Sequence, residues 1–246
     1  MAALGVAVVI ELTVPQVSPA LFSGIVAFAA VGSIMALARQ LPVTNVLAAA
    51  AIAAVMGGMA HGLSAWSGIP FGPVTFSEAA GPKLFNIVPW TLPLLWIVAV
   101  LNSRGVARVV LRPWRKVKTY GLWLLTLSAV LALAFDVALE PFAAQVKHFW
   151  LWQPTRLPIT WHGASLMDFL GWLFVSALIL AFAMPFLIRK QPGSRSTTDY
   201  APLALWFGAM GLFAIGTAEV ALWSAVIVDS ILAVCVAVFC WRGARW

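Results

Sequence analysis

Long runs of apolar residues, separated by short segments rich in proline, glycine and charge, dominate the sequence. Such runs predict membrane-spanning helices, because about 20 apolar residues in a helix cross the hydrocarbon core. We expect spans at about 2–14, 19–38, 44–66, 85–103, 119–140 and 166–188, and a further run at 201–241. The last run is too long for one crossing, so we expect it to break near Glu219. The pattern predicts an all-α, polytopic integral membrane protein, with seven or eight transmembrane helices in one bundle and a single domain over 1–246.

The apolar pattern is interrupted most strongly from His61 to Trp90, which we call the breaker-rich stretch. Its glycines and prolines are Gly62, Gly68, Gly72, Gly81, Pro70, Pro73, Pro82 and Pro89. Each proline removes a backbone donor and clashes with the preceding turn, so one continuous helix is excluded here. The stretch is nevertheless apolar, and irregular apolar backbone between spans needs internal partners or a cavity. We therefore predict a re-entrant or interfacial segment over 67–84, where a pocket can form.

Composition and charge support the membrane assignment. Hydrophobic residues make up 63% of the chain and charged residues only 9%, against about a quarter in soluble domains. If Arg39 is cytoplasmic, the fifteen Lys and Arg residues divide twelve to three between the two sides. This division follows the positive-inside rule and predicts a cytoplasmic C-terminus in a bacterial cytoplasmic (inner) membrane. It also explains the net charge of +7, so we expect no nucleic-acid partner. Cys235 and Cys240 are interpreted as apolar fillers without a disulfide.

Most acidic residues and all three histidines fall at the outer level of the predicted bundle. They are Glu11, Glu78, Asp136, Glu140, Asp168, Glu219, His61, His148 and His162. Intramembrane carboxylates are costly and are candidates for function, although they also pair with each other or cap helices. An outer loop at 141–165 carries Trp150, Trp152 and Trp161, which suit an interfacial aromatic belt. No nucleotide-binding or zinc-protease motif is present, and the histidines are scattered, so we expect no cofactor and no metal.

Several motifs resemble those of a membrane carotenoid biosynthesis family, which includes the cofactor-independent carotenoid 1,2-hydratases of the bacterioruberin and γ-carotene type. Residues 68–72, 81–85 and 88–89 resemble its GxPFG, LGPKLF and VP signature. DVALEP at 136–141 resembles its DxxxDP, WLW at 150–152 its WxW, and DFLGW at 168–172 its NFLGW. The resemblance covers about 57–190. The chain departs from the family pattern at four polar positions, which are His61, Val74, Glu140 and Asp168.

The resemblance implies an enzyme that adds water to the terminal C=C bond of an acyclic carotenoid end. A carboxylic acid, kept protonated by an apolar site, would protonate the alkene to a tertiary cation. Water would then attack, helped by a basic side chain, while aromatic faces stabilise the cation. The candidate catalytic residues are Asp136, Glu140, Asp168, His61 and His162. The candidate substrate-binding residues are Trp66, Pro70, Phe71, Gly72, Phe85, Trp152 and Trp172.

Two other interpretations stay open. The departures at His61 and Asp168 favour a non-catalytic carotenoid-binding or assembly subunit of a membrane complex, in which the thirteen tryptophans and small-residue helix faces provide contacts. A transporter is the third interpretation, but the internal repeat that is usual in transporters is not visible. The expected partners are a carotenoid or other polyene lipid and the membrane lipids, with a homo-oligomer or membrane complex as a further expectation.

Overall fold

Seven long helices form the protein in the computed structural model, which describes residues 19–154, 159–188 and 200–245. They are α2 (Pro19–Ala38), α3 (Val43–Ser67), α4 (Thr91–Val110), α5 (Tyr120–Pro141), α6 (Leu166–Ala183), α7 (Ala201–Glu219) and α8 (Trp223–Ala244). All seven are long and apolar enough to cross a membrane, which confirms the predicted all-α, polytopic bundle. The expected break near Glu219 is also confirmed, because α7 ends there. The span expected at 2–14 lies outside the described residues.

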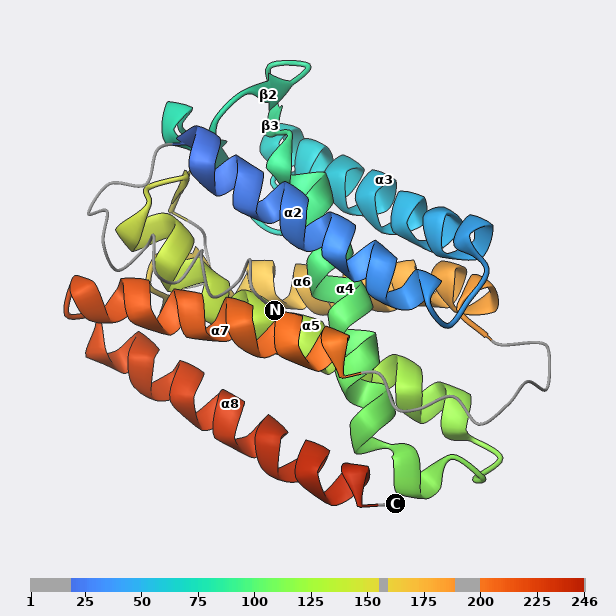
Figure 1. The fold of residues 1–246 in the computed structure, drawn as a ribbon. Helices are drawn as coiled ribbons and strands as arrows, with labels where there is room; N and C mark the ends of the chain where they lie inside the picture. Colours follow the sequence, from blue (N-terminus) through green and yellow to red (C-terminus); the bar gives the residue numbers. More distant parts are fainter. Residues whose placement is uncertain (1–18, 155–158, 189–199, 246) are drawn as a thin grey trace.

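Helix α4 runs through the middle of the bundle, with α2 and α3 toward the top of Figure 1 and α7 and α8 toward the bottom. It contacts each of the other six long helices. The close approach of α3 depends on Gly57, because a Cβ atom there would stand 2.1 Å from Cγ of the fully buried Trp96 on α4. The core is therefore built around a central helix whose neighbours present small residues to it.

The span predicted at 85–103 is wrong by several residues at both ends. Residues Lys83–Leu84 (β2) and Val88–Pro89 (β3) form an antiparallel hairpin instead, and α4 begins only at Thr91. Hydropathy could not separate an apolar hairpin from an apolar helix. At the other end the charge of Arg104 suggested a boundary, but its guanidinium is buried and donates to the Leu187 carbonyl at 2.6 Å.

The breaker-rich stretch is helical only as far as Ser67, where Gly68 ends α3 with a φ of 74° that favours glycine. Beyond it lie β1 (Val74–Phe76), a 3₁₀ turn η1 (Glu78–Ala80) and the β2–β3 hairpin. Strand β1 pairs antiparallel with β4 (Trp150–Trp152), with Val74 opposite Trp152 and Phe76 opposite Trp150. The segment 67–84 and the loop 141–165 are thus joined through one ladder and lie at the same end of the bundle.

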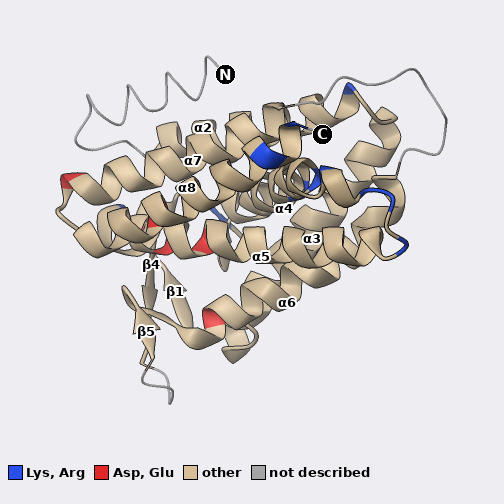
Figure 2. Cartoon of the chain, turned by 90° about the horizontal axis from the view of Figure 1, so that it is seen from below, with Lys and Arg blue, Asp and Glu red and all other residues tan. Residues whose placement is uncertain are grey.

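The remaining short elements lie next to the ends of the long helices α4, α5 and α6. A π-helical turn, η3 (Phe142–Val146), extends α5, and β5 (Thr160–Trp161) pairs with β6 (Ala164–Ser165) just before α6. The 3₁₀ turns η2 (Arg112–Trp114) and η4 (Met184–Phe186) follow α4 and α6. Figure 2 shows acidic residues toward the end that carries the strands and most basic residues toward the other end. This separation agrees with the charge division in the sequence.

Candidate functional site

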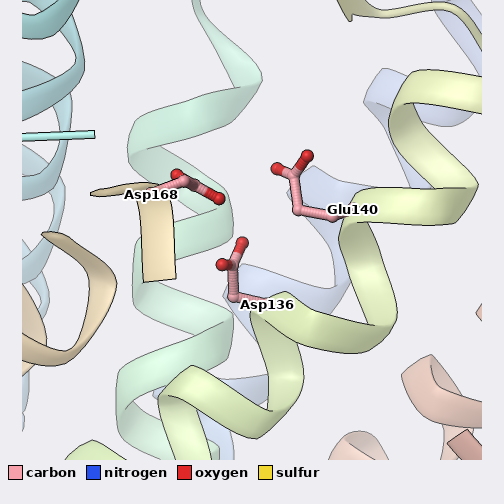
Figure 3. Close-up of side chains that lie close together, drawn as sticks. All are labelled: Asp136, Glu140 and Asp168. Carbon is pink, nitrogen blue, oxygen red and sulfur yellow. The ribbon is translucent and has the colours of Figure 1, made fainter. Parts of the chain in front are cut away.

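Three carboxyl groups converge at the strand-bearing end of the bundle. Asp136 and Glu140 lie one turn apart on α5, and Asp168 lies in the first turn of α6. Each offers an oxygen that lies within 4.8 Å of the others, and the side chains point toward one another (Figure 3). Asp136 and Asp168 are completely buried, and Glu140 is 2% exposed. The three residues, which we call the carboxyl cluster, were all expected as catalytic candidates, and the structure brings them together.

Local sequence explains how α5 presents two of these groups. A spacing of four residues places Asp136 and Glu140 on one helix face. Pro141 cannot donate a hydrogen bond to the Val137 carbonyl four residues earlier, and the Trp161 indole donates to this carbonyl instead, at 3.1 Å. The backbone group left without a helical partner is therefore satisfied from the outer loop, and the helix end that carries Glu140 is tied to that loop.

Hydrogen bonding distinguishes Glu140 from the two aspartates. Its Oε2 accepts from the indole nitrogens of Trp150, at 3.2 Å, and Trp152, at 2.7 Å. No N–H or O–H group of any other residue in the described part of the chain donates to Asp136 or Asp168, so the two carboxyl groups have only each other as hydrogen-bond partners. Two ionised carboxylates cannot bond to each other, since both only accept, whereas a shared proton turns one into a donor. Burying an unpartnered charge is costly, so the aspartates are expected to hold a proton or a cation.

The chemistry open to such a cluster is limited to two classes. A shared proton could be delivered to an apolar substrate, with Glu140 as a separate acceptor. Alternatively, the three oxygens could ligate a hard cation, since such ions prefer oxygen ligands. The sequence predicts no metal.

His61 was expected beside the carboxylates, but its contacts in the structure are aromatic. Its ring stacks on Phe71 with centroids 4.2 Å apart, and it borders Trp96 and Trp172, which stack on each other at 4.0 Å. Neither ring nitrogen of His61 has a hydrogen-bond partner among the described residues. His61 therefore belongs to an aromatic cluster, and Trp172, one turn after Asp168 on α6, links this cluster to the carboxyl cluster.

His162 also lies apart from the hydrogen bonds of the carboxyl cluster. Its Nε2 lies 3.1 Å from the Ser224 hydroxyl at the start of α8, and its ring packs edge-on against Trp161. Partial burial lowers the pKa of the imidazole below its usual value, which favours the neutral form. The position of His162 fits a contact between the outer loop and α8.

The candidate substrate-binding residues separate into two groups. Phe71 and Trp172 are buried in the aromatic cluster, and Pro70 packs against α6, where its carbonyl oxygen lies 2.9 Å from a Cβ built on Gly171. The Gly72 carbonyl accepts from the Ser64 hydroxyl, which fixes the turn after α3. In contrast, Trp66 and Phe85 are 86% and 93% exposed. Phe85 lines an apolar groove of about 400 Å³ between α3 and the β2–β3 hairpin.

Two features of the site were missed in the sequence. Trp150 and Trp152 were interpreted as belt residues or, for Trp152, as a substrate contact, whereas both indoles bond to Glu140. The Trp-Leu-Trp alternation is the signal that could have revealed them, because alternate residues of a strand share a face. Asp229 on α8 is a further buried carboxyl group without a hydrogen-bond partner among the described residues, and it lies outside the carboxyl cluster.

Comparison with known proteins defines the class to which this bundle belongs. The profile of the family described as "Carotenoid biosynthesis protein" matches residues 20–239. The chain therefore belongs to this carotenoid biosynthesis family, as its motifs suggested. A curated relative, bisanhydrobacterioruberin hydratase of Haloarcula japonica, is 29% identical over 121 residues, which make up 49% of this chain and 39% of the relative. The match thus spans well under half of that protein, and no solved structure is significantly similar.

Proposed function

We propose that the protein hydrates the terminal C=C bond of an acyclic carotenoid end. The observation that carries the proposal is the carboxyl cluster, in which two buried aspartates without donors stand beside a glutamate that has two. Family membership supports a carotenoid substrate, and the name of the Haloarcula relative supports water addition. In this proposal the chain lies in a bacterial cytoplasmic membrane, with its C-terminus in the cytoplasm and the substrate entering from the lipid.

The proposed reaction needs only groups that the cluster offers. A proton held by Asp136 and Asp168 is transferred to the less substituted alkene carbon, which leaves a tertiary cation. The absence of other donors to these aspartates supports this role, because ionising both buried carboxyl groups is costly, so that the pair keeps a proton available for transfer at neutral pH. Water then bonds to the cation, and its excess proton goes to a nearby carboxylate. Indole faces next to Glu140 favour the positive charge at this stage.

The test is co-expression with a pathway that makes an acyclic carotenoid, followed by pigment analysis. The parent chain should yield a product heavier than the carotenoid by one water, and Asp136→Asn should yield none while folding normally, because the amide has the same shape but no transferable proton. Asp229→Asn is the matched control, since it neutralises another buried, unpartnered carboxyl group, and it should keep full product.

Two outcomes would contradict the proposal. Well-expressed protein that retains carotenoid through purification without converting it would favour a non-catalytic binding subunit. Activity in Asp136→Asn, together with loss of activity on treatment with a chelator and recovery on adding a divalent cation, would replace the proton-sharing interpretation with a cation site.

A further inference from the structure

We propose that Trp150 and Trp152 are positioning residues, which hold Glu140 as the group that accepts the proton of the attacking water. This inference rests on the proposed hydration and assigns its acid and base roles to different members of the carboxyl cluster. Asp136 and Asp168 then form the proton-donating pair, and Glu140 is the separate base. In this role the two tryptophans act through Glu140 by their N–H groups, which is separate from any stabilisation of the cation by their ring faces.

The division follows from the distribution of hydrogen-bond donors. Both indole N–H groups point at the same oxygen of Glu140, at 3.2 and 2.7 Å. A carboxylate accepts hydrogen bonds and donates none, so two N–H donors on one oxygen match its ionised form. The aspartates have no such donors in the described part of the chain. Three adjacent carboxyl groups thus lie in two environments, one suited to an acceptor and the other to a shared proton.

The strand register keeps the two indoles in place. Trp150 and Trp152 are alternate residues of β4 and face the same way, while Leu151 between them is exposed on the other face. The β1–β4 ladder is extended at both ends by backbone hydrogen bonds, from Ser77 to the Phe149 carbonyl and from Gln153 to the Pro73 carbonyl, at 2.9 and 3.0 Å. The breaker-rich stretch therefore supports the base by holding the strand that carries its two donors.

The chemical step balances without an oxidant or any further reactant. The O–H bond of the aspartate pair breaks, and its proton forms a C–H bond with the alkene, whose π electrons are used in this bond. The oxygen of water then bonds to the tertiary cation, and one water proton passes to Glu140. Transfer of that proton from Glu140 to the aspartate pair, whose nearest ligand oxygens lie within 4.8 Å, restores the starting state. The net change is the addition of one water.

The first experiment replaces each indole by a ring without the N–H group. Trp152→Phe and Trp150→Phe keep an aromatic face but remove one hydrogen bond to Glu140. Trp161→Phe is the matched control, because it also removes an indole bond to α5, but one that ends on the Val137 carbonyl. We expect kcat to fall about 10- to 100-fold in the first two variants, from loss of a bond to a charged group. KM should be unchanged in both, and Trp161→Phe should keep its kcat.

The second experiment detects the hydrogen bonds between the two indoles and Glu140 by NMR and does not depend on enzyme activity. In protein labelled with ¹⁵N-tryptophan in detergent micelles, Glu140→Gln should shift the indole N–H resonances of Trp150 and Trp152 and leave that of Trp161 in place. Unshifted resonances would overturn the proposed contacts whether or not the parent protein is active.

The two experiments separate failure of this inference from failure of the hydration itself. An active parent whose Trp152→Phe and Trp150→Phe variants retain full kcat would overturn the positioning role and leave the hydration intact. An equal loss of kcat in Trp161→Phe would assign the tryptophans to general stability and would also overturn it. A folded parent that converts no acyclic carotenoid would remove the hydration, and with it the assignment of Glu140 as its base.

Discussion

A methyl group added at Gly57 provides a sharp test of the packing around the aromatic cluster. An ideal Cβ at this position stands 2.1, 2.4 and 2.6 Å from Cγ, Cδ1 and Cδ2 of Trp96. Carbon atoms in ordinary contact are about 3.5–4.0 Å apart, so the indole would have to retreat by about 1.4 Å. Trp96 is fully buried and stacks on Trp172 at 4.0 Å, so its movement also displaces α6.

The expected loss of stability combines two opposing effects. Overpacking of this kind costs about 1–3 kcal/mol, and replacing glycine by alanine within a helix returns about 1 kcal/mol. We therefore expect Gly57→Ala to lower the free energy of unfolding by about 0–2 kcal/mol, and the 2.1 Å contact favours the upper end, equivalent to a fall in Tm of up to about 8 °C for a chain of this size. Gly211→Ala on α7 is the control, because no atom of the described residues outside its own helical turns lies within 4 Å of the added Cβ, and it should be neutral or slightly stabilising.

The measurement is thermal unfolding in mild detergent, combined with near-ultraviolet circular dichroism. Stacked indoles couple electronically, so displacement of Trp96 from Trp172 should alter the tryptophan bands of Gly57→Ala and leave those of Gly211→Ala unchanged. Equal Tm values and identical spectra for the two variants would refute the close approach of α3 to α4 at Gly57.

Three further predictions concern the strand-bearing end. Cysteines at Thr75 and Leu151, which are exposed and directly opposed in the β1–β4 ladder, should form a disulfide on oxidation in a background without the native cysteines; absence of cross-linking would contradict the register. A single cysteine at Gln153 should react with an impermeant reagent in intact cells, and protection until lysis would invert the proposed topology. Because burial lowers the pKa of His162 from 6.5, the folded protein should lose some stability as the pH falls below about 6.5; His162→Gln should weaken this dependence, which Tm measured across that range detects.

Much of the fold could be predicted from the sequence, because a membrane restricts the choice of structure. A run of about 20 apolar residues in a membrane is expected to form a helix, because a helix satisfies all its backbone hydrogen bonds internally. The break near Glu219 followed from the length of the last apolar run. The hairpin that ends at Pro89 was not predicted, because the expectation of a helix rested on hydropathy. Hydropathy measures the transfer of side chains, so it cannot reveal that a short apolar segment satisfies its backbone through a local ladder.

The proximity of the three carboxyl groups could be predicted from the sequence, but the hydrogen bonds around them could not. Asp136 and Glu140 could be placed together from helical spacing, and Asp168 from its level in the membrane. The role of Trp150 could not, because the strand that carries its indole is paired with β1, a contact between segments more than seventy residues apart that the sequence does not reveal. The same limit applies to His61, whose partners come from three different segments of the chain.

Two of the departures from the family pattern, Glu140 and Asp168, lie together in the carboxyl cluster. Glu140 and Asp168 are separated by 28 positions in the sequence, yet their carboxyl oxygens belong to one cluster within 4.8 Å. In the pattern that the motifs resemble, the first position carries a shorter acid and the second an amide. The longer side chain of Glu140 reaches the two indoles. Asp168, an acid in place of the amide, can share a proton with Asp136. Unlike an amide, it offers no N–H group to an ionised Asp136. The two departures therefore lie in one site and both place a carboxyl group there, which is what the proposed division of acid and base roles requires.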